Sequence, residues 1–151
     1  MARFALGRDI RFFEGISREL VDAVVTTSVV LYKLIIEDSK TNLYGESLSK
    51  TYFQGVETNA MIQREGVQAN YEGFGSDTSQ TVEFRFNKFT LAETGFYPEI
   101  GDIIYHNDGY FEIDNVTEEQ LIGGRVGEKF SIICSTFMTR RSSIQTEMRI
   151  V

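Results

Sequence analysis

Two side chains in this sequence, His106 and Cys134, are the only ones of their kind and offer the most direct routes to chemistry at neutral pH. An imidazole titrates near neutrality and can act as a general base, and Asp108 follows it by two residues. However, a histidine beside a turn is more often a surface polar group. Cys134 lies in the middle of a predicted strand, on one face with Phe130 and Ile132, where a buried free cysteine usually behaves as a small hydrophobic residue. We therefore expect no catalytic residue.

Metal and cofactor sites are also disfavoured. A zinc cage of thiolate and imidazole ligands within one chain is excluded by the single His and single Cys. The acids around Asp108 do not have the spacing of a calcium-binding loop. The glycine cluster at Gly73–Ser76 lacks the lysine of a phosphate-binding loop. Phe96, Tyr110 and Phe111 have the shape to stack on bases but no lysine or arginine nearby, so packing explains them better. We expect no metal and no cofactor.

Charge is distributed unevenly along the chain, whose net charge is −7 and whose pI is ≈ 4.8. An acidic protein lacks the basic footprint of a general nucleic-acid binder. From Phe89 to Gly124 there is no lysine or arginine but there are eight acids: Glu93, Glu99, Asp102, Asp108, Glu112, Asp114, Glu118 and Glu119. The C-terminal end is basic, with Arg140, Arg141 and Arg149. This asymmetry suits head-to-tail contact between copies, although ordinary solvated faces would give the same pattern.

The central segment predicts a β-hairpin. Two runs rich in Ile, Tyr and Phe flank Asn107-Asp108-Gly109, and Asp-Gly between such runs is a strong hairpin signal. Pro98, the only proline, suits the beginning of a strand because it has no N–H to donate. We predict strands at about 100–106 and 110–116.

Shorter elements surround this hairpin. Ser17 is a plausible N-cap for a helix at about 18–26, and Phe12, Phe13 and Ile16 are expected to anchor the N-terminal segment on the body. Residues 48–53 are ambiguous between helix and strand. Further strands are predicted at about 28–36, 58–65, 81–87 and 130–138, the third of them with clean alternation of apolar and polar residues.

The predicted fold is a single, mainly β domain over residues 1–151 with a short N-terminal helix. Its body is a small antiparallel β-barrel or sandwich of about five to seven strands. We divide the chain into an N-terminal segment at 1–27, a β body at about 28–138 and a tail at 139–151. The tail either frays or adds a strand to a neighbouring subunit. Nothing in the sequence approaches a membrane-spanning apolar run.

Several segments together resemble a known family. The most specific of them are Leu43–Ser47, and Pro98–Ile104 followed by Phe111–Ile113. The likeness extends over most of the chain through three further segments, Asp9–Phe13, Arg18–Val21 and Phe74–Phe86. In this order they resemble the neck proteins of contractile-tailed bacteriophages, which are head-to-tail connector components of the head-completion or stopper kind. None of these segments is catalytic.

The resemblance implies a structural virion protein that forms a homo-oligomeric, hexameric ring between the portal-side adaptor and the tail terminator. Such a ring closes the DNA-filled head, docks the tail and lets DNA pass through its lumen without sequence-specific binding. The eight acids become candidates for the lumen or the ring interface, and the three C-terminal arginines for an inter-subunit tail. Alternatives are a tail terminator or head-tail adaptor, a small β-barrel that binds a ligand, and a small hydrolase that uses His106.

Overall fold

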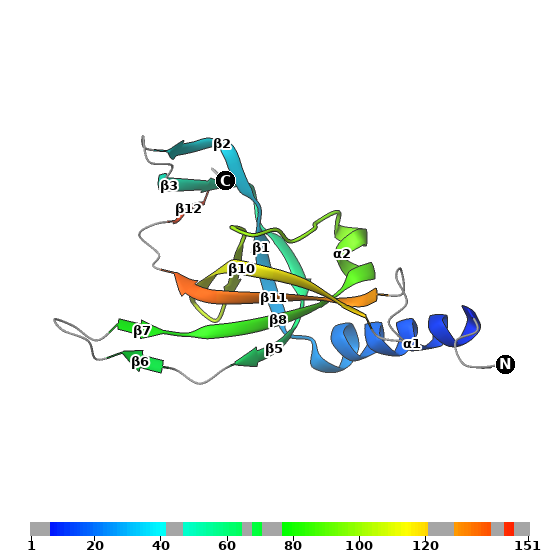
Figure 1. Cartoon of the computed structure of the whole chain (residues 1–151). Coiled ribbons are helices and arrows are strands. Elements are labelled where there is room, and N and C mark those ends of the chain that lie inside the picture. Colours follow the sequence, from blue (N-terminus) through cyan, green and yellow to red (C-terminus); the bar gives the residue numbers. More distant parts are fainter. Residues whose placement is uncertain are drawn as a thin grey trace.

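The computed structural model describes residues 7–41, 47–64, 68–70, 77–120, 129–139 and 144–146. The predicted mainly β, antiparallel fold is confirmed. Its main sheet has seven antiparallel strands in the order β4-β1-β9-β10-β11-β8-β5 (Figure 1). These strands are β1 Ser28–Tyr32, β4 Val56–Asn59, β5 Met61–Arg64, β8 Thr81–Asn87, β9 Ile103–His106, β10 Gly109–Gln120 and β11 Lys129–Thr139.

Smaller elements complete the described chain. A three-stranded sheet has the order β12-β3-β2, and β6 pairs with β7. Their bounds are β2 Leu34–Thr41, β3 Ser47–Tyr52, β6 Gln68–Asn70, β7 Asp77–Ser79 and β12 Ile144–Thr146. The helices are α1 Gly7–Glu19, the π-helix η1 Leu20–Val25 and α2 Lys88–Thr94. In the part of the chain described, no helix is both long and apolar enough to cross a membrane.

The main sheet is curled, and its two edge strands follow each other in the sequence. The edge strands β4 and β5 are separated only by Ala60, which is fully buried and whose N–H donates to the carbonyl oxygen of Thr27 at 2.9 Å. β4 and β5 do not pair with each other in the strand order, so the sheet is not a closed barrel and its form is consistent with a sandwich. The predicted strand at 58–65 is thus two strands that bend at Ala60.

The central hairpin is confirmed. His106 pairs with Gly109, which leaves a two-residue turn in which Asn107 and Asp108 have φ values of 48° and 62°. Positive φ at both positions matches the right-handed twist of the flanking strands. Gly109 was expected to supply the positive φ of the turn, but Asn107 and Asp108 do so instead. Glycine is favoured at 109 because a Cβ there would lie 3.0 Å from the ring of Phe111. The first strand begins at Ile103 rather than 100, since Gly101 turns the chain with φ 95°.

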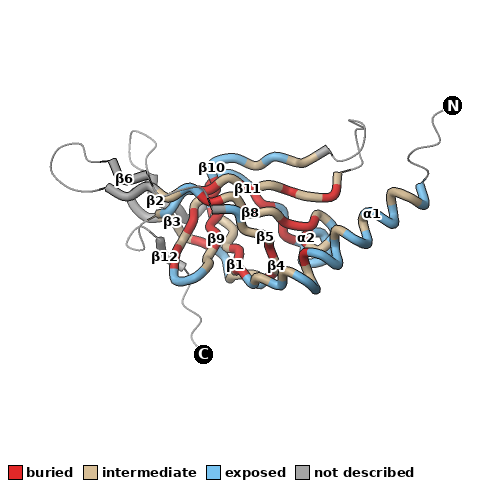
Figure 2. The backbone as a smooth tube through the Cα atoms, turned by 90° about the horizontal axis from the view of Figure 1, so that it is seen from below, coloured by how far each residue is buried: buried red, intermediate tan, exposed pale blue. Residues whose placement is uncertain are grey.

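The core lies on one face of the main sheet. The alternation predicted at 81–87 is confirmed with the same bounds, and Val82, Phe84 and Phe86 are buried. The ring of Phe84 contacts that of Phe111, with centroids 5.6 Å apart. Leu91 of α2 belongs to the same cluster, so α2 covers part of this face (Figure 2).

Helix α2 has no counterpart among the elements predicted from the sequence. Asn87 caps it, because its Oδ1 accepts hydrogen bonds from the backbone N–H groups of Phe89 at 2.9 Å and Thr90 at 3.4 Å. Gly95 ends it with φ 71°. Asn before a short mixed segment and Gly after it are the usual boundary signals of a helix. The seven residues between them are too few for a clear periodicity.

The N-terminal helix was predicted too short. α1 begins at Gly7, continues through the predicted N-cap Ser17 and passes into η1, which ends at Val25. Thr26, with φ 42°, then donates its N–H to the carbonyl oxygen of Val21. A π-helix is rare, and it widens the last turns of this helical segment.

Other boundaries also differ. The predicted strand at 28–36 is broken at Lys33 into β1 and β2, which belong to different sheets. The ambiguous residues 48–53 form most of β3, and the strand at 130–138 is confirmed as β11. In the described part of the tail, β12 pairs in parallel with β3 of its own chain. Arg140, Arg141 and Arg149 lie outside the described residues.

Candidate functional site

The candidate site is the exposed apolar face of α1 and η1. No residue of α1 is buried, and the helix extends away from the sheet (Figure 1, Figure 2). Five apolar side chains, which we call the apolar stripe, remain open to solvent. They are Phe12, Phe13, Ile16, Leu20 and Val24, with exposed fractions of 64%, 50%, 47%, 43% and 68%. The prediction that Phe12, Phe13 and Ile16 anchor the segment on the body is therefore wrong.

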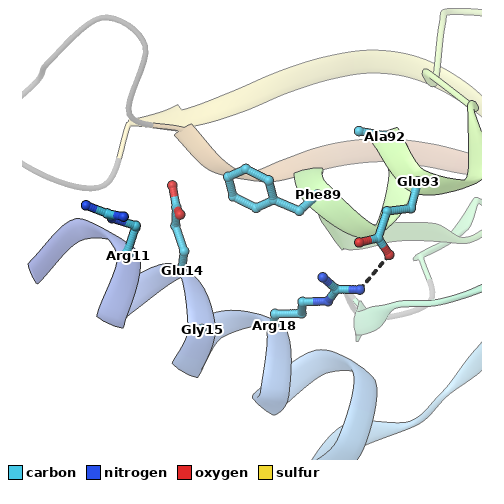
Figure 3. Close-up of a pocket in the computed structure, with 7 residues that line it drawn as sticks. All are labelled: Arg11, Glu14, Gly15, Arg18, Phe89, Ala92 and Glu93. Atoms are coloured by element: carbon cyan, nitrogen blue, oxygen red, sulfur yellow. Dashed lines mark hydrogen bonds and ion pairs between the residues drawn. The ribbon is translucent and has the colours of Figure 1, made fainter. Parts of the chain in front are cut away.

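Helical periodicity explains why the stripe faces outward. Phe12, Ile16, Leu20 and Val24 recur every four residues and therefore share one side of the helix. Arg11, Glu14 and Arg18 lie on another side and face α2, where they line a groove (Figure 3). The side of α1 that faces α2 is therefore charged. Further along, in η1, the contact with the body is apolar: Val21 is buried, and the partly exposed Leu20 lines a small groove with Met61 and Phe86.

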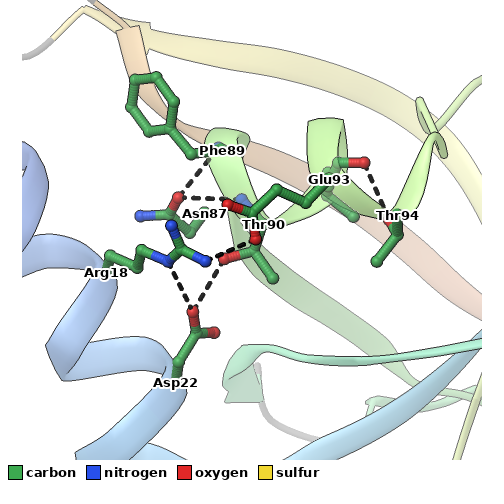
Figure 4. A network of polar contacts seen from close by, with 8 residues as sticks. Arg18, Asp22, Asn87, Phe89, Thr90, Glu93 and Thr94 are labelled. Carbon is green, nitrogen blue, oxygen red and sulfur yellow. Dashed lines mark hydrogen bonds and ion pairs between the residues drawn. The ribbon is translucent and has the colours of Figure 1, made fainter.

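A polar cluster attaches the C-terminal half of the helix to α2 (Figure 4). The guanidinium of Arg18 lies 2.5 Å from the Glu93 carboxylate and 3.5 Å from that of Asp22. Thr90 Oγ1 donates to Asp22 Oδ2 at 2.8 Å. The hydrogen bond and charge of Glu93 raise the pKa of Arg18 above its ordinary value. These contacts fix the position of α1 and leave the stripe exposed.

The groove between α1 and α2 has a volume of about 590 Å³. Besides the residues just named, Gly15, Phe89 and Ala92 line it (Figure 3). Four of the seven residues that line it are charged, whereas small-molecule pockets carry only a few polar groups among apolar side chains. Arg18 is paired with Glu93 across the groove, whereas Arg11 donates to the carbonyl oxygen of Gly7 in its own helix, and we assign no ligand to this groove.

A second groove lies beyond α2, between the loop that joins α2 to β9 and the chain at Lys33 and Phe53–Val56. We call it the loop groove; it has a volume of about 420 Å³ and is lined by Lys33, Phe53, Gln54, Val56, Gly95, Phe96, Tyr97 and Glu99. Phe53 and Tyr97 are 53% and 51% exposed. Lys33 Nζ lies 2.7 Å from Glu99 and 5.5 Å from the centroid of the Phe96 ring.

Asp102, one of the eight acids predicted for the site, has a structural role beneath this groove. Its side chain is 2% exposed, and it accepts hydrogen bonds from Lys33 Nζ at 3.0 Å, Leu34 N at 3.0 Å and Glu99 N at 2.8 Å. These bonds hold the α2–β9 loop against the point where β1 becomes β2. They also explain why the predicted strand at 28–36 breaks at Lys33.

The other seven acids are distributed over α2, the α2–β9 loop, the hairpin turn and β10. Five of them form ion pairs with lysine or arginine side chains from other segments. These pairs are Glu93 with Arg18, Glu99 with Lys33, Glu112 with Lys50, Glu118 with Lys88 and Lys129, and Glu119 with Arg85. Asp108 accepts from the Tyr105 hydroxyl at 2.9 Å, and Asp114 is exposed. Counting charged residues along the sequence showed that the segment is acidic, but it did not show which lysines and arginines neutralise the acids.

The two residues first considered for catalysis have structural surroundings. The half-buried His106 packs edge-on against Phe84, with ring centroids 6.3 Å apart. Cys134 is fully buried within the core cluster. Within the described residues, no group of three or more His, Cys, Asp or Glu side chains could hold a metal ion.

Cys134 yields a testable prediction. Burial raises the pKa of its thiol from 9.0 to about 12, so the folded protein holds this proton longer than the unfolded chain. Stability is therefore expected to fall as pH rises above 9, because only the unfolded chain loses the proton there. At pH 8 a thiol reagent should label Cys134 only after denaturant is added. Rapid labelling of the native protein would contradict the buried position.

Comparisons with known proteins add little. No protein-family model matches the sequence, and no curated protein matches it. Among solved structures, a chain from the virion of a native gene transfer agent (GTA) particle is similar in shape, with 15% sequence identity and a TM-score of 0.47. The match covers 76% of this chain and 94% of that chain. At this identity and TM-score the likeness supports no functional statement.

Proposed function

We propose that this protein is a structural component of a phage neck. It forms a ring between the portal-side adaptor and the tail, closes the DNA-filled head and provides the surface on which the tail docks. The observation that carries the proposal is the apolar stripe on a helix that buries none of its own residues. The sequence resemblance to neck proteins supplies the identity of the assembly.

An apolar stripe of this kind calls for a protein partner. Burial of apolar surface is favourable, and contiguous exposed apolar patches mark interaction sites. A helix of 13 residues is also marginal in water without tertiary packing. The cluster at Arg18 supports only the C-terminal half of α1, so Phe12 and Phe13 gain their packing, and the helix its full stability, from another subunit.

The acidic character of the chain is compatible with a DNA channel. A protein of net charge −7 repels phosphates, so DNA would slide through a ring of such subunits without adhering. Asp114 is exposed on β10 and is the acid best placed to face a lumen or a neighbouring subunit. Arg140, Arg141 and Arg149 remain proposed as a tail that contacts an adjacent copy.

Deletion of the gene from the phage that encodes this protein tests the proposed function. Electron microscopy is expected to show heads that have lost DNA and unattached tails, and a plasmid copy of the gene should restore complete particles. Antibody labelling of complete particles should mark the head-tail junction. Infectious, tailed particles that lack the protein would contradict the proposal.

A further inference from the structure

We propose that the apolar stripe of one subunit docks into the loop groove of a second copy of the same chain. This inference rests on the proposed ring and names the two surfaces that build it. The stripe comprises Phe12, Phe13, Ile16, Leu20 and Val24, and the groove is centred on Phe53 and Tyr97.

The stripe would supply more than half of the area that one partner buries in a standard interface. From the exposed fractions of its five side chains, the stripe offers roughly 500 Å² of apolar surface, against the ≈ 800 Å² per partner of a standard interface. The backbone and polar flanks of α1 would supply the remainder. A helix laid in a groove with anchors at every third or fourth position is an established mode of recognition.

The groove is suited to receive such a helix. Phe53 and Tyr97 are half-exposed aromatic rings, and Ile100, which follows the lining residue Glu99, is also exposed. Lys33 is held by Glu99 and Asp102, so its charge is compensated before any partner arrives. The floor of the groove is fixed, because Asp102 binds backbone N–H groups on both sides of it.

The stripe does not reach the groove of its own chain. Arg18 and Asp22 attach the helix to one side of α2 through Glu93 and Thr90. The groove begins after α2, at Gly95, and none of its lining residues also lines the α1–α2 groove. One chain therefore presents two different apolar surfaces in different places, which is what heterologous, head-to-tail association requires; such contacts form a ring where the rotation between copies closes.

Charge disfavours a membrane as the occupant of the stripe. Interfacial helices carry an excess of lysine or arginine on their polar face. In α1 three arginines are balanced by Asp9, Glu14 and Glu19, and the whole chain is acidic. An anionic bilayer would repel this protein, whereas the loop groove, in which Lys33 is paired with Glu99 and Asp102, would not.

Crosslinking with engineered cysteines tests the contact, because the native Cys134 is buried. Full-length Ile16→Cys and Tyr97→Cys proteins are mixed and treated with a short bismaleimide reagent. We expect a covalent dimer that contains one chain of each kind. A protein that carries both substitutions should give a ladder of crosslinked species that ends at the size of the ring. The matched control mixes Ile16→Cys with Thr117→Cys, an exposed position on β10, and should give no dimer.

The outcomes separate this inference from the proposed function. A ring-sized mass without the crosslink would overturn the docking mode and leave the ring intact. Dimers of Ile16→Cys with itself would also overturn it, because they indicate stripe-to-stripe contact. A control mixture that crosslinks equally would show collision rather than docking and count against the inference. If particles need the protein but still assemble when the contact between stripe and loop groove is lost, the proposed function would stand and the docking mode would be overturned.

Discussion

Phe12→Glu combined with Ile16→Glu is expected to convert the assembled protein into single chains of 17.2 kDa. Both side chains are about half exposed or more in one subunit, so the substitutions leave its core unchanged. In the assembly they would place two carboxylates against an apolar surface. We estimate a cost of about 4 kcal/mol in association free energy, which is about a thousandfold in affinity. Analytical ultracentrifugation over a range of concentrations measures the change.

The control for this variant is Thr117→Glu, which adds a carboxylate at an exposed position on β10 away from α1. It should leave the mass of the assembly unchanged. Glutamate is a good helix former, and the repulsion between two glutamates four residues apart costs only about 0.5 kcal/mol, so α1 is expected to persist in the double variant. Circular dichroism and thermal melting of both variants confirm that the fold remains. Assembly of the double variant at the same concentration as the native protein would refute a role for the stripe.

Asp102→Ala is expected to lower the free energy of unfolding by about 3 kcal/mol, the second large effect. The buried carboxylate accepts bonds from Lys33, from Leu34 N and from Glu99 N. Its removal leaves two backbone N–H groups and a partly buried ammonium without this acceptor. Urea unfolding of the full chain measures the loss.

The matched control for Asp102→Ala is Asp114→Ala. Asp114 is an exposed acid, and its removal should change the free energy of unfolding by less than about 0.5 kcal/mol. Asp102→Asn should fall between the two, since an amide oxygen still accepts but the charge opposite Lys33 is gone. Equal stability of the Asp102→Ala and native proteins would mean that the carboxylate does not hold the α2–β9 loop.

Sequence patterns predicted those elements whose structure depends on neighbouring residues in the sequence. The alternation at 81–87 and the Asn-Asp-Gly turn were enough to place β8 and the central hairpin. The breaks at Lys33 and Ala60 were not predictable in this way. They depend on Asp102 and on the carbonyl of Thr27, which are distant in sequence and come near only in the folded chain.

The candidate site was only partly predictable. Phe12, Phe13 and Ile16 were singled out from the sequence, but apolar residues were expected to pack inside their own chain. The structure leaves these side chains exposed, and in the proposed assembly they are covered by a second copy, a surface that the sequence pattern of one chain does not reveal. Likewise, the number of acids in the segment could be counted from the sequence. Their ion pairs with Lys33, Lys50 and Arg85 are formed only in the folded structure.

The most direct test of the account is the mass of the purified full-length protein in solution, with and without the neighbouring neck components. We predict a ring of six chains of 17.2 kDa, formed alone or on addition of those components. A protein that stays a single chain at every concentration and in the presence of its neck neighbours would contradict the account.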